Sequence, residues 1–156
     1  MIRFFVPGIA RPGGSKRGFV NPRNGRVIIT EDNKRSKDWR ASVAWAAAEN
    51  IKVPLEGPLA VTFEFQFMRP KGHYGSKGLR ASAPVHPAVR PDLLKVARST
   101  EDAMSGLAYR DDAQIVHETL IKRYDCQAGA WITIAAANGA SPDGNPEGGL
   151  TRGIEQ

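Results

Sequence analysis

The residues best suited to chemistry are acidic side chains in the second half of the chain. Asp92 follows a proline, and Asp111 and Asp112 stand together in the segment Tyr-Arg-Asp-Asp-Ala-Gln. Mg²⁺ binds oxygen ligands, needs only one or two carboxylates and keeps several waters, which leaves room for phosphate oxygens. Asp92 and Asp112 would meet that need if the fold brought them together. The alternative is that the adjacent acids are solvated turn residues.

A helix is expected to position the first of these acids. It should follow Pro91, run to about Ser105 and end at Gly106. At 100° per residue, one face collects Leu93, Val96, Ala97, Thr100, Ala103 and Met104. The opposite arc collects Lys95, Arg98, Glu101, Asp102 and Ser105. Leu94 falls within this polar arc; a single exposed leucine is common on surfaces, but this one lies two residues after Asp92.

Charge is unevenly distributed along the chain. There are 22 basic and 16 acidic residues, for a net charge of +6. Basic residues concentrate in 11–40 and 69–90, whereas acids gather in 92–125. This pattern indicates a surface for a polyanion around a cation-binding site, although solvated surface charge would look the same.

Length and composition exclude several classes of protein. A chain of 156 residues is expected to form one domain, and 41% hydrophobic residues with 24% charged ones are atypical of a disordered polyelectrolyte. No apolar run approaches the roughly 18–20 residues of a membrane span, and the first residues do not resemble a signal peptide. A single cysteine, Cys126, excludes an internal disulfide, so we expect a cytoplasmic protein without membrane partners.

The patterns along the chain predict an α+β domain over residues 1–137, followed by a disordered tail over 138–156. Strands are expected at Ile2–Val6, Arg26–Thr30, Leu59–Phe67, Ile115–Tyr124 and Ala130–Ala135. A first helix is expected over Ser36–Asn50 with Ser36 as its N-cap, and loops over Arg11–Gly18 and 69–90. The turn signal Asn24-Gly25 makes a hairpin plausible before the 26–30 strand.

Aromatic residues are interpreted mainly as core. Trp39, Val43 and Ala46 recur at helical spacing, and the alternating row over 59–67 favours a half-buried strand over a base-stacking platform. Trp45 lies off the helical stripe. It covers either a second core surface or a subunit interface, and the sequence favours neither interpretation.

These motifs, in this order, resemble the RusA-type Holliday junction resolvases of phages and prophages. The family pattern is approximately Pro-Asp-x-Asp-Asn-Leu-x-Lys, then Asp-Ala-Leu, then Asp-Asp-x-Gln. Similarity extends over roughly residues 2–135 and includes Val6-Pro7-Gly8, Gly14-Ser15-Lys16-Arg17, Lys37, Trp39-Arg40, Arg69-Pro70-Lys71, His73-Tyr74 and Lys122.

The resemblance implies a small homodimer with a mixed β-sheet and two main helices. Such proteins bind four-way DNA junctions and cut them with Mg²⁺ or Mn²⁺, in DNA recombination and repair. By position, Asp92 and Asp112 are metal-binding aspartates, Asp111 is a neighbouring ligand candidate, and Arg98 replaces the helper lysine. For the DNA-binding surface the basic segments nominate Lys16, Arg17, Lys71, Lys77 and Lys122.

Leu94 occupies the position of an expected metal-binding aspartate. It is a natural degenerate change, a deliberate inactivating substitution, or a change compensated by another acid such as Glu101 or Asp102. We therefore expect a resolvase with impaired cleavage. The alternatives are a catalytically inactive junction-binding protein of prophage origin and a nucleic-acid-binding domain without preference for DNA structure.

Overall fold

A four-stranded mixed sheet forms the centre of the protein. The computed structural model describes residues 1–13, 16–31 and 34–137, so the predicted tail lies outside the described residues. The strand order is β1-β8-β4-β7. These strands are β1 (Ile2–Pro7), β8 (Gly129–Ala136), β4 (Leu59–Met68) and β7 (Ile115–Asp125). Only the β4–β7 pair is parallel, which confirms the predicted α+β class and the mixed sheet.

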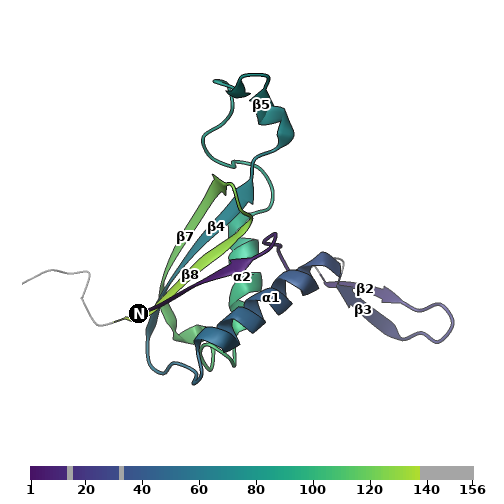
Figure 1. The fold of residues 1–156 in the computed structure, drawn as a ribbon. Helices are drawn as coiled ribbons and strands as arrows, with labels where there is room; N and C mark the ends of the chain where they lie inside the picture. Colours follow the sequence, from purple (N-terminus) through teal and green to yellow (C-terminus); the bar gives the residue numbers. More distant parts are fainter. Residues whose placement is uncertain (14–15, 32–33, 138–156) are drawn as a thin grey trace, which may run out of the picture.

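Two helices pack together beside this sheet (Figure 1). They are α1 (Lys34–Asn50), which packs on β1, and α2 (Leu93–Met104), which packs on β7. In the buried contact between them, the indole Nε1 of Trp39 donates to Thr100 Oγ1 at 3.1 Å. The predicted N-cap at Ser36 is wrong: the helix begins earlier, and Ser36 is a buried residue within it.

The predicted core is confirmed. Leu59, Val61, Phe63 and Phe65 alternate as buried residues along β4, and the stripe at Trp39, Val43 and Ala46 is buried. Trp45, by contrast, is 63% exposed, so it belongs to no second core surface among the residues that the structure describes. Among the described residues, no helix is long and apolar enough to cross a membrane.

A β-hairpin projects from the body beyond the start of α1 (Figure 1). Its strands are β2 (Lys16–Val20) and β3 (Val27–Glu31), paired antiparallel, and Gly25 adopts φ +65° in the connecting turn. The hairpin expected from Asn24-Gly25 is therefore confirmed. The loop predicted over Arg11–Gly18 is wrong at its end, because Gly18 lies in β2 and pairs with Ile29. Pairing with β3 makes this segment a strand, although its own composition is typical of a loop.

The predicted loop over 69–90 is a folded excursion. It contains one single-turn helix, η1 (Lys71–His73), and two short antiparallel strands, β5 (Tyr74–Gly75) and β6 (Gly78–Leu79). The Arg69 guanidinium donates to the carbonyl oxygens of Pro84 (2.8 Å) and Val85 (3.4 Å). The same group lies 4.5 Å from the centre of the Tyr124 ring. These contacts tie the start of the excursion both to residues 84–85 and to β7, which composition alone could not reveal.

Candidate functional site

Asp92 begins α2 as its N-cap. Its extended backbone precedes the first helical residue, and its Oδ1 accepts a hydrogen bond from the Lys95 amide at 3.3 Å. An N-cap carboxylate satisfies a free amide of the first turn and interacts favourably with the positive end of the helix dipole. One oxygen of Asp92 is thus engaged locally while the side chain stays exposed.

The backbone leading to Asp92 is held by Lys122 on β7. Its ammonium donates to the carbonyl oxygens of Val89 and Pro91, the latter at 2.9 Å. It also lies 5.8 Å from the centre of the Phe67 ring. The predicted DNA-binding role of Lys122 stays a prediction, because this ammonium already serves the segment before α2.

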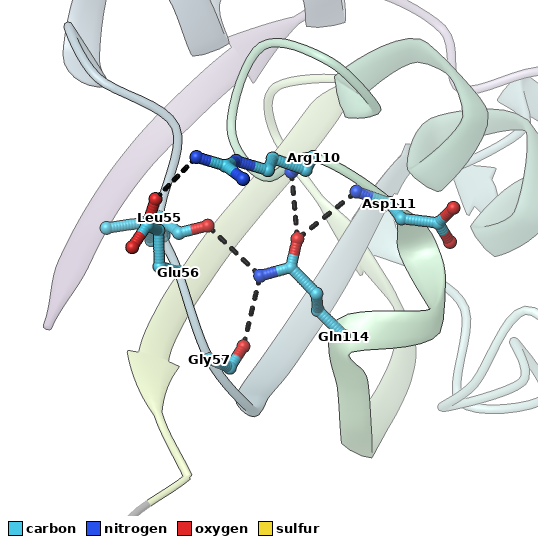
Figure 2. Close-up of polar contacts among 6 residues, drawn as sticks. All are labelled: Leu55, Glu56, Gly57, Arg110, Asp111 and Gln114. Carbon is cyan, nitrogen blue, oxygen red and sulfur yellow. Dashed lines mark hydrogen bonds and ion pairs between the residues drawn. The ribbon is translucent and has the colours of Figure 1, made fainter.

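The turn that carries Asp111 and Asp112 is held by the Gln114 side chain (Figure 2). Gln114 Oε1 accepts from the amides of Arg110 (2.8 Å) and Asp111 (3.2 Å). Its Nε2 donates to the carbonyl oxygens of Leu55 and Gly57, both at 3.0 Å. Both lone pairs of the amide oxygen and both N–H groups of the amide nitrogen are therefore engaged. The glutamine of the Asp-Asp-x-Gln motif therefore joins the turn to the segment before β4.

The two acids of this turn have different surroundings. Asp111 is the N-cap of the single-turn helix η2 (Asp112–Gln114), and its Oδ1 accepts from the Ala113 amide at 2.8 Å. Figure 2 shows its carboxylate directed away from Gln114. Asp112 instead lines a cleft between α2 and β7. Both acids are exposed, as solvated turn residues would be, but one caps η2 and the other lines the cleft.

This acidic cleft encloses about 350 Å³. It is lined by Leu94, Ala97, Arg98, Glu101, Asp112 and Glu118. Burial raises the pKa of Glu101 to about 8, with further increases from a hydrogen bond to Glu118 and from the charges of Glu118, Asp112 and Asp102. The burial and the neighbouring acids thus favour the protonated form of the Glu101 carboxyl.

The Tyr109 side chain is hydrogen-bonded to the backbone of a residue that lines the same cleft. It is fully buried, and its hydroxyl donates to the backbone carbonyl oxygen of Glu101 at 3.0 Å. Burial, followed by the charge of Glu101, raises the pKa of the Tyr109 phenol, so the ring stays a neutral donor. This bond joins the end of α2 to the turn that precedes Asp112.

Asp92 lies in a different cavity, a basic groove of about 1110 Å³. Its lining includes Arg11, Pro12, Ala88, Val89, Arg90, Pro91, Asp92, Leu93, Leu94, Lys95 and Lys122. Leu94 lines both this groove and the acidic cleft, and it is 69% exposed. The misplaced leucine therefore stands where the groove of Asp92 meets the cleft of Asp112.

The residues present do not make a three-carboxylate metal site. Within 1–13, 16–31 and 34–137, no group of three or more His, Cys, Asp and Glu side chains is arranged to hold a metal ion. Asp92 and Asp111 each give one oxygen to a helix cap, and the side chain between the groove and the cleft is a hydrocarbon. The donor set is thus too poor for the Mg²⁺ site that three acids would form.

The remaining predicted residues lie around these cavities. Arg98 lines the acidic cleft together with Glu101, Asp112 and Glu118. Lys71 and Lys77 are exposed on the 69–90 excursion, and Lys16 and Arg17 lie in β2. Glu118 was missed as a site residue, because nothing in its own strand pattern shows that it faces Glu101.

Comparison with known proteins identifies the class of protein that this fold and these cavities represent. Residues 10–135 match the family model described as Endodeoxyribonuclease RusA, a span that includes the hairpin, both helices and both cavities. The chain therefore belongs to the RusA endodeoxyribonuclease family, as the motifs predicted. It is also 29% identical over 127 residues to the uncharacterized protein YqaN of Bacillus subtilis (strain 168), covering 79% of this chain and 87% of that protein.

Proposed function

We propose that the protein recognises four-way DNA junctions and that its metal-dependent cleavage of them is impaired by Leu94. The observation that carries the proposal is the position of this exposed leucine between the Asp92 groove and the Asp112 cleft. Membership of the RusA family supports a nuclease ancestry and junction DNA as the substrate class.

The binding part of the proposal rests on the basic groove. Arg11, Arg90 and Lys95 surround Asp92 there, so the groove presents positive charge to a phosphate backbone. Lys71 and Lys77 extend the same charge onto the exposed excursion. Binding through phosphate neutralisation releases counterions and so weakens steeply with salt. A homodimer, in which two such grooves face two strands of one junction, belongs to this proposal.

The cleavage part rests on what a leucine cannot do. A hydrocarbon side chain donates no electron pair to Mg²⁺ or Mn²⁺ and orients no water, so Asp92 and Asp112 act without a carboxylate between them. Arg98 supplies one positive charge beside Asp112, in the position of the helper lysine. Arginine keeps the charge of lysine but not its compact ammonium geometry.

The deciding experiment restores the carboxylate. Labelled four-way junctions, duplexes and single strands are incubated with the wild-type protein, Leu94→Asp and Leu94→Asn, with Mg²⁺, Mn²⁺ or a chelator. Leu94→Asp should raise junction nicking at least ~100-fold, the scale on which a single charge-stabilising group acts in catalysis. Leu94→Asn, which has the same size without the charge, should not. Junction affinity in chelator should change little in either variant.

Two results would contradict the proposal. Wild-type cleavage as fast as that of Leu94→Asp would show that Leu94 impairs nothing. Equal affinity for junction and duplex would instead indicate a nucleic-acid-binding domain without structural preference. In the Leu94→Asp background, Asp112→Asn should remove the gained nicking while leaving binding intact.

A further inference from the structure

We propose that the β2–β3 hairpin is a DNA-binding arm that enters a groove of the duplex next to the basic groove of α2. The inference rests on the proposed recognition of DNA and adds the element that reaches along a duplex arm. Figure 1 shows this hairpin standing apart from the sheet and helices, joined to them only at its base.

The base of the arm lies on the wall of the basic groove. Arg11 and Pro12, which lead into the hairpin, line that groove together with Asp92 and Lys95. The next residue, Gly13, runs close to α2: a Cβ built there would lie 3.8 Å from Ser99 Cβ and Oγ. A duplex lying over Asp92 would therefore meet the arm where it leaves the body.

The tip of the arm is fixed by its own asparagines. Asn21 Oδ1 accepts from the Arg23 amide at 2.9 Å, and Asn24 Oδ1 accepts from the Arg26 amide at 3.1 Å. The Asn21 amide in turn donates to the Arg26 carbonyl at 2.8 Å. Side-chain bonds of this kind define a turn without help from the rest of the protein. The two exposed arginines are thus presented on a preformed tip rather than on a random loop.

The charge of the arm indicates which kind of partner it binds. Residues 11–31 contain Arg11, Lys16, Arg17, Arg23 and Arg26 but only one acid, Glu31. Five cations against one anion on a narrow projection suit a polyphosphate, and they disfavour packing against a surface of the same sign. Charge complementarity therefore favours nucleic acid over a second copy of this chain.

The β2–β3 hairpin also carries two exposed valines. Val20 and Val27 lie opposite each other in the β2–β3 register and are 61% and 65% exposed. An isolated two-stranded hairpin is only marginally stable in water, so such a pair gains from being covered. The major groove of B-DNA admits a two-stranded β-ribbon and offers thymine methyl groups for apolar contact. One partner, duplex DNA, thus accounts for the shape, the charge and the valines.

The test compares matched charge and valine variants. Arg23→Gln with Arg26→Gln removes the tip charges, and the control Lys52→Gln removes an exposed charge elsewhere. Val20→Thr with Val27→Thr removes the apolar pair but keeps β-branching, and Val53→Thr, at another exposed valine, is its control. Affinity for a fluorescent four-way junction and a fluorescent duplex is measured by anisotropy over a range of NaCl concentrations. Circular dichroism verifies that each variant retains the fold.

The tip variant should bind both DNAs about 10-fold more weakly, with a salt slope smaller by about 1.8, the value for two lost phosphate contacts. Its control should match the wild type. The Val20/Val27 variant should weaken binding several-fold with an unchanged slope, whereas the Val53→Thr control should not weaken binding.

Three results would overturn the inference. If the arm variants bind as the wild type does, the arm is not used, although the proposed DNA recognition stands. If the wild-type protein binds no DNA, the proposed function fails first and the arm with it. If Val20→Thr with Val27→Thr converts a dimer into a monomer in sedimentation, the ribbon packs on a second copy instead.

Discussion

The Lys122 ammonium donates a hydrogen bond to the Pro91 carbonyl oxygen at 2.9 Å, one residue before the Asp92 cap. A cation on β7 thereby holds the chain segment that enters α2, and it does so with a second bond to Val89. The position of Asp92 in its groove consequently depends on a strand that comes much later in the sequence.

Replacing Lys122 by methionine should therefore act on stability before DNA binding. Methionine keeps the apolar stem but loses both carbonyl contacts, which should cost about 1–2 kcal/mol for a partly exposed group. Urea unfolding measures this cost. The control is Lys77→Met, which should leave the unfolding free energy unchanged but reduce the salt dependence of junction binding. A reduced salt slope for Lys122→Met at unchanged stability would restore the original DNA-contact interpretation.

Gln114 should be among the costliest polar residues to replace. Gln114→Met leaves the carbonyls of Leu55 and Gly57 and the Asp111 amide without their partner, with an expected loss of about 2 kcal/mol. Gln114→Glu should be as severe, because a carboxylate would face two carbonyl oxygens. Thermal unfolding checks both, against Gln127→Met at an exposed position. Melting temperatures equal to that of the wild type would show that the Gln114 side chain does not stabilise this turn.

The raised pKa of Glu101 predicts a pH-dependent stability. Its pKa is about 8 in the folded protein and 4.5 in the unfolded chain, so the folded state binds more protons between these values. Stability is therefore greatest below about pH 4.5 for this group and falls as pH rises through 8. Glu101→Gln removes this proton uptake and should flatten the melting-temperature profile between pH 5 and 8.5. Glu49→Gln, on an exposed part of α1, should leave the profile unchanged.

The buried bond between the helices gives a further measurable effect. Thr100→Val keeps the shape but leaves the Trp39 indole nitrogen without its acceptor, at a cost of about 1–3 kcal/mol. In the Trp39→Phe background the same change should cost much less, since the donor is already gone. Chemical denaturation of the four proteins of this double-mutant cycle measures the coupling. Additive losses would show that the indole and the hydroxyl act independently.

Local patterns predicted most of the elements correctly. Alternation along 59–67 and helical spacing along 93–104 report which face of an element is buried, and burial depends mainly on residue type. Two differences from the predictions arose where order comes from elsewhere: Gly18 is held by a partner strand, and Arg69 anchors an excursion rich in turn residues. Neither contact leaves a periodic signal in the sequence.

The sequence by itself determined the family, the helix that carries Asp92, and the anomaly at Leu94. The family follows from the order of the motifs, and the helix and the misplaced leucine follow from the 3.6-residue period of apolar residues. Only the tertiary structure decided what surrounds them. The parallel pairing of β4 with β7 places Glu118 beside the end of α2 and Lys122 beside its start, and these neighbours are distant in the sequence. Long-range pairing sets which polar groups share a cleft, and with it their charge and protonation. No local pattern encodes that outcome.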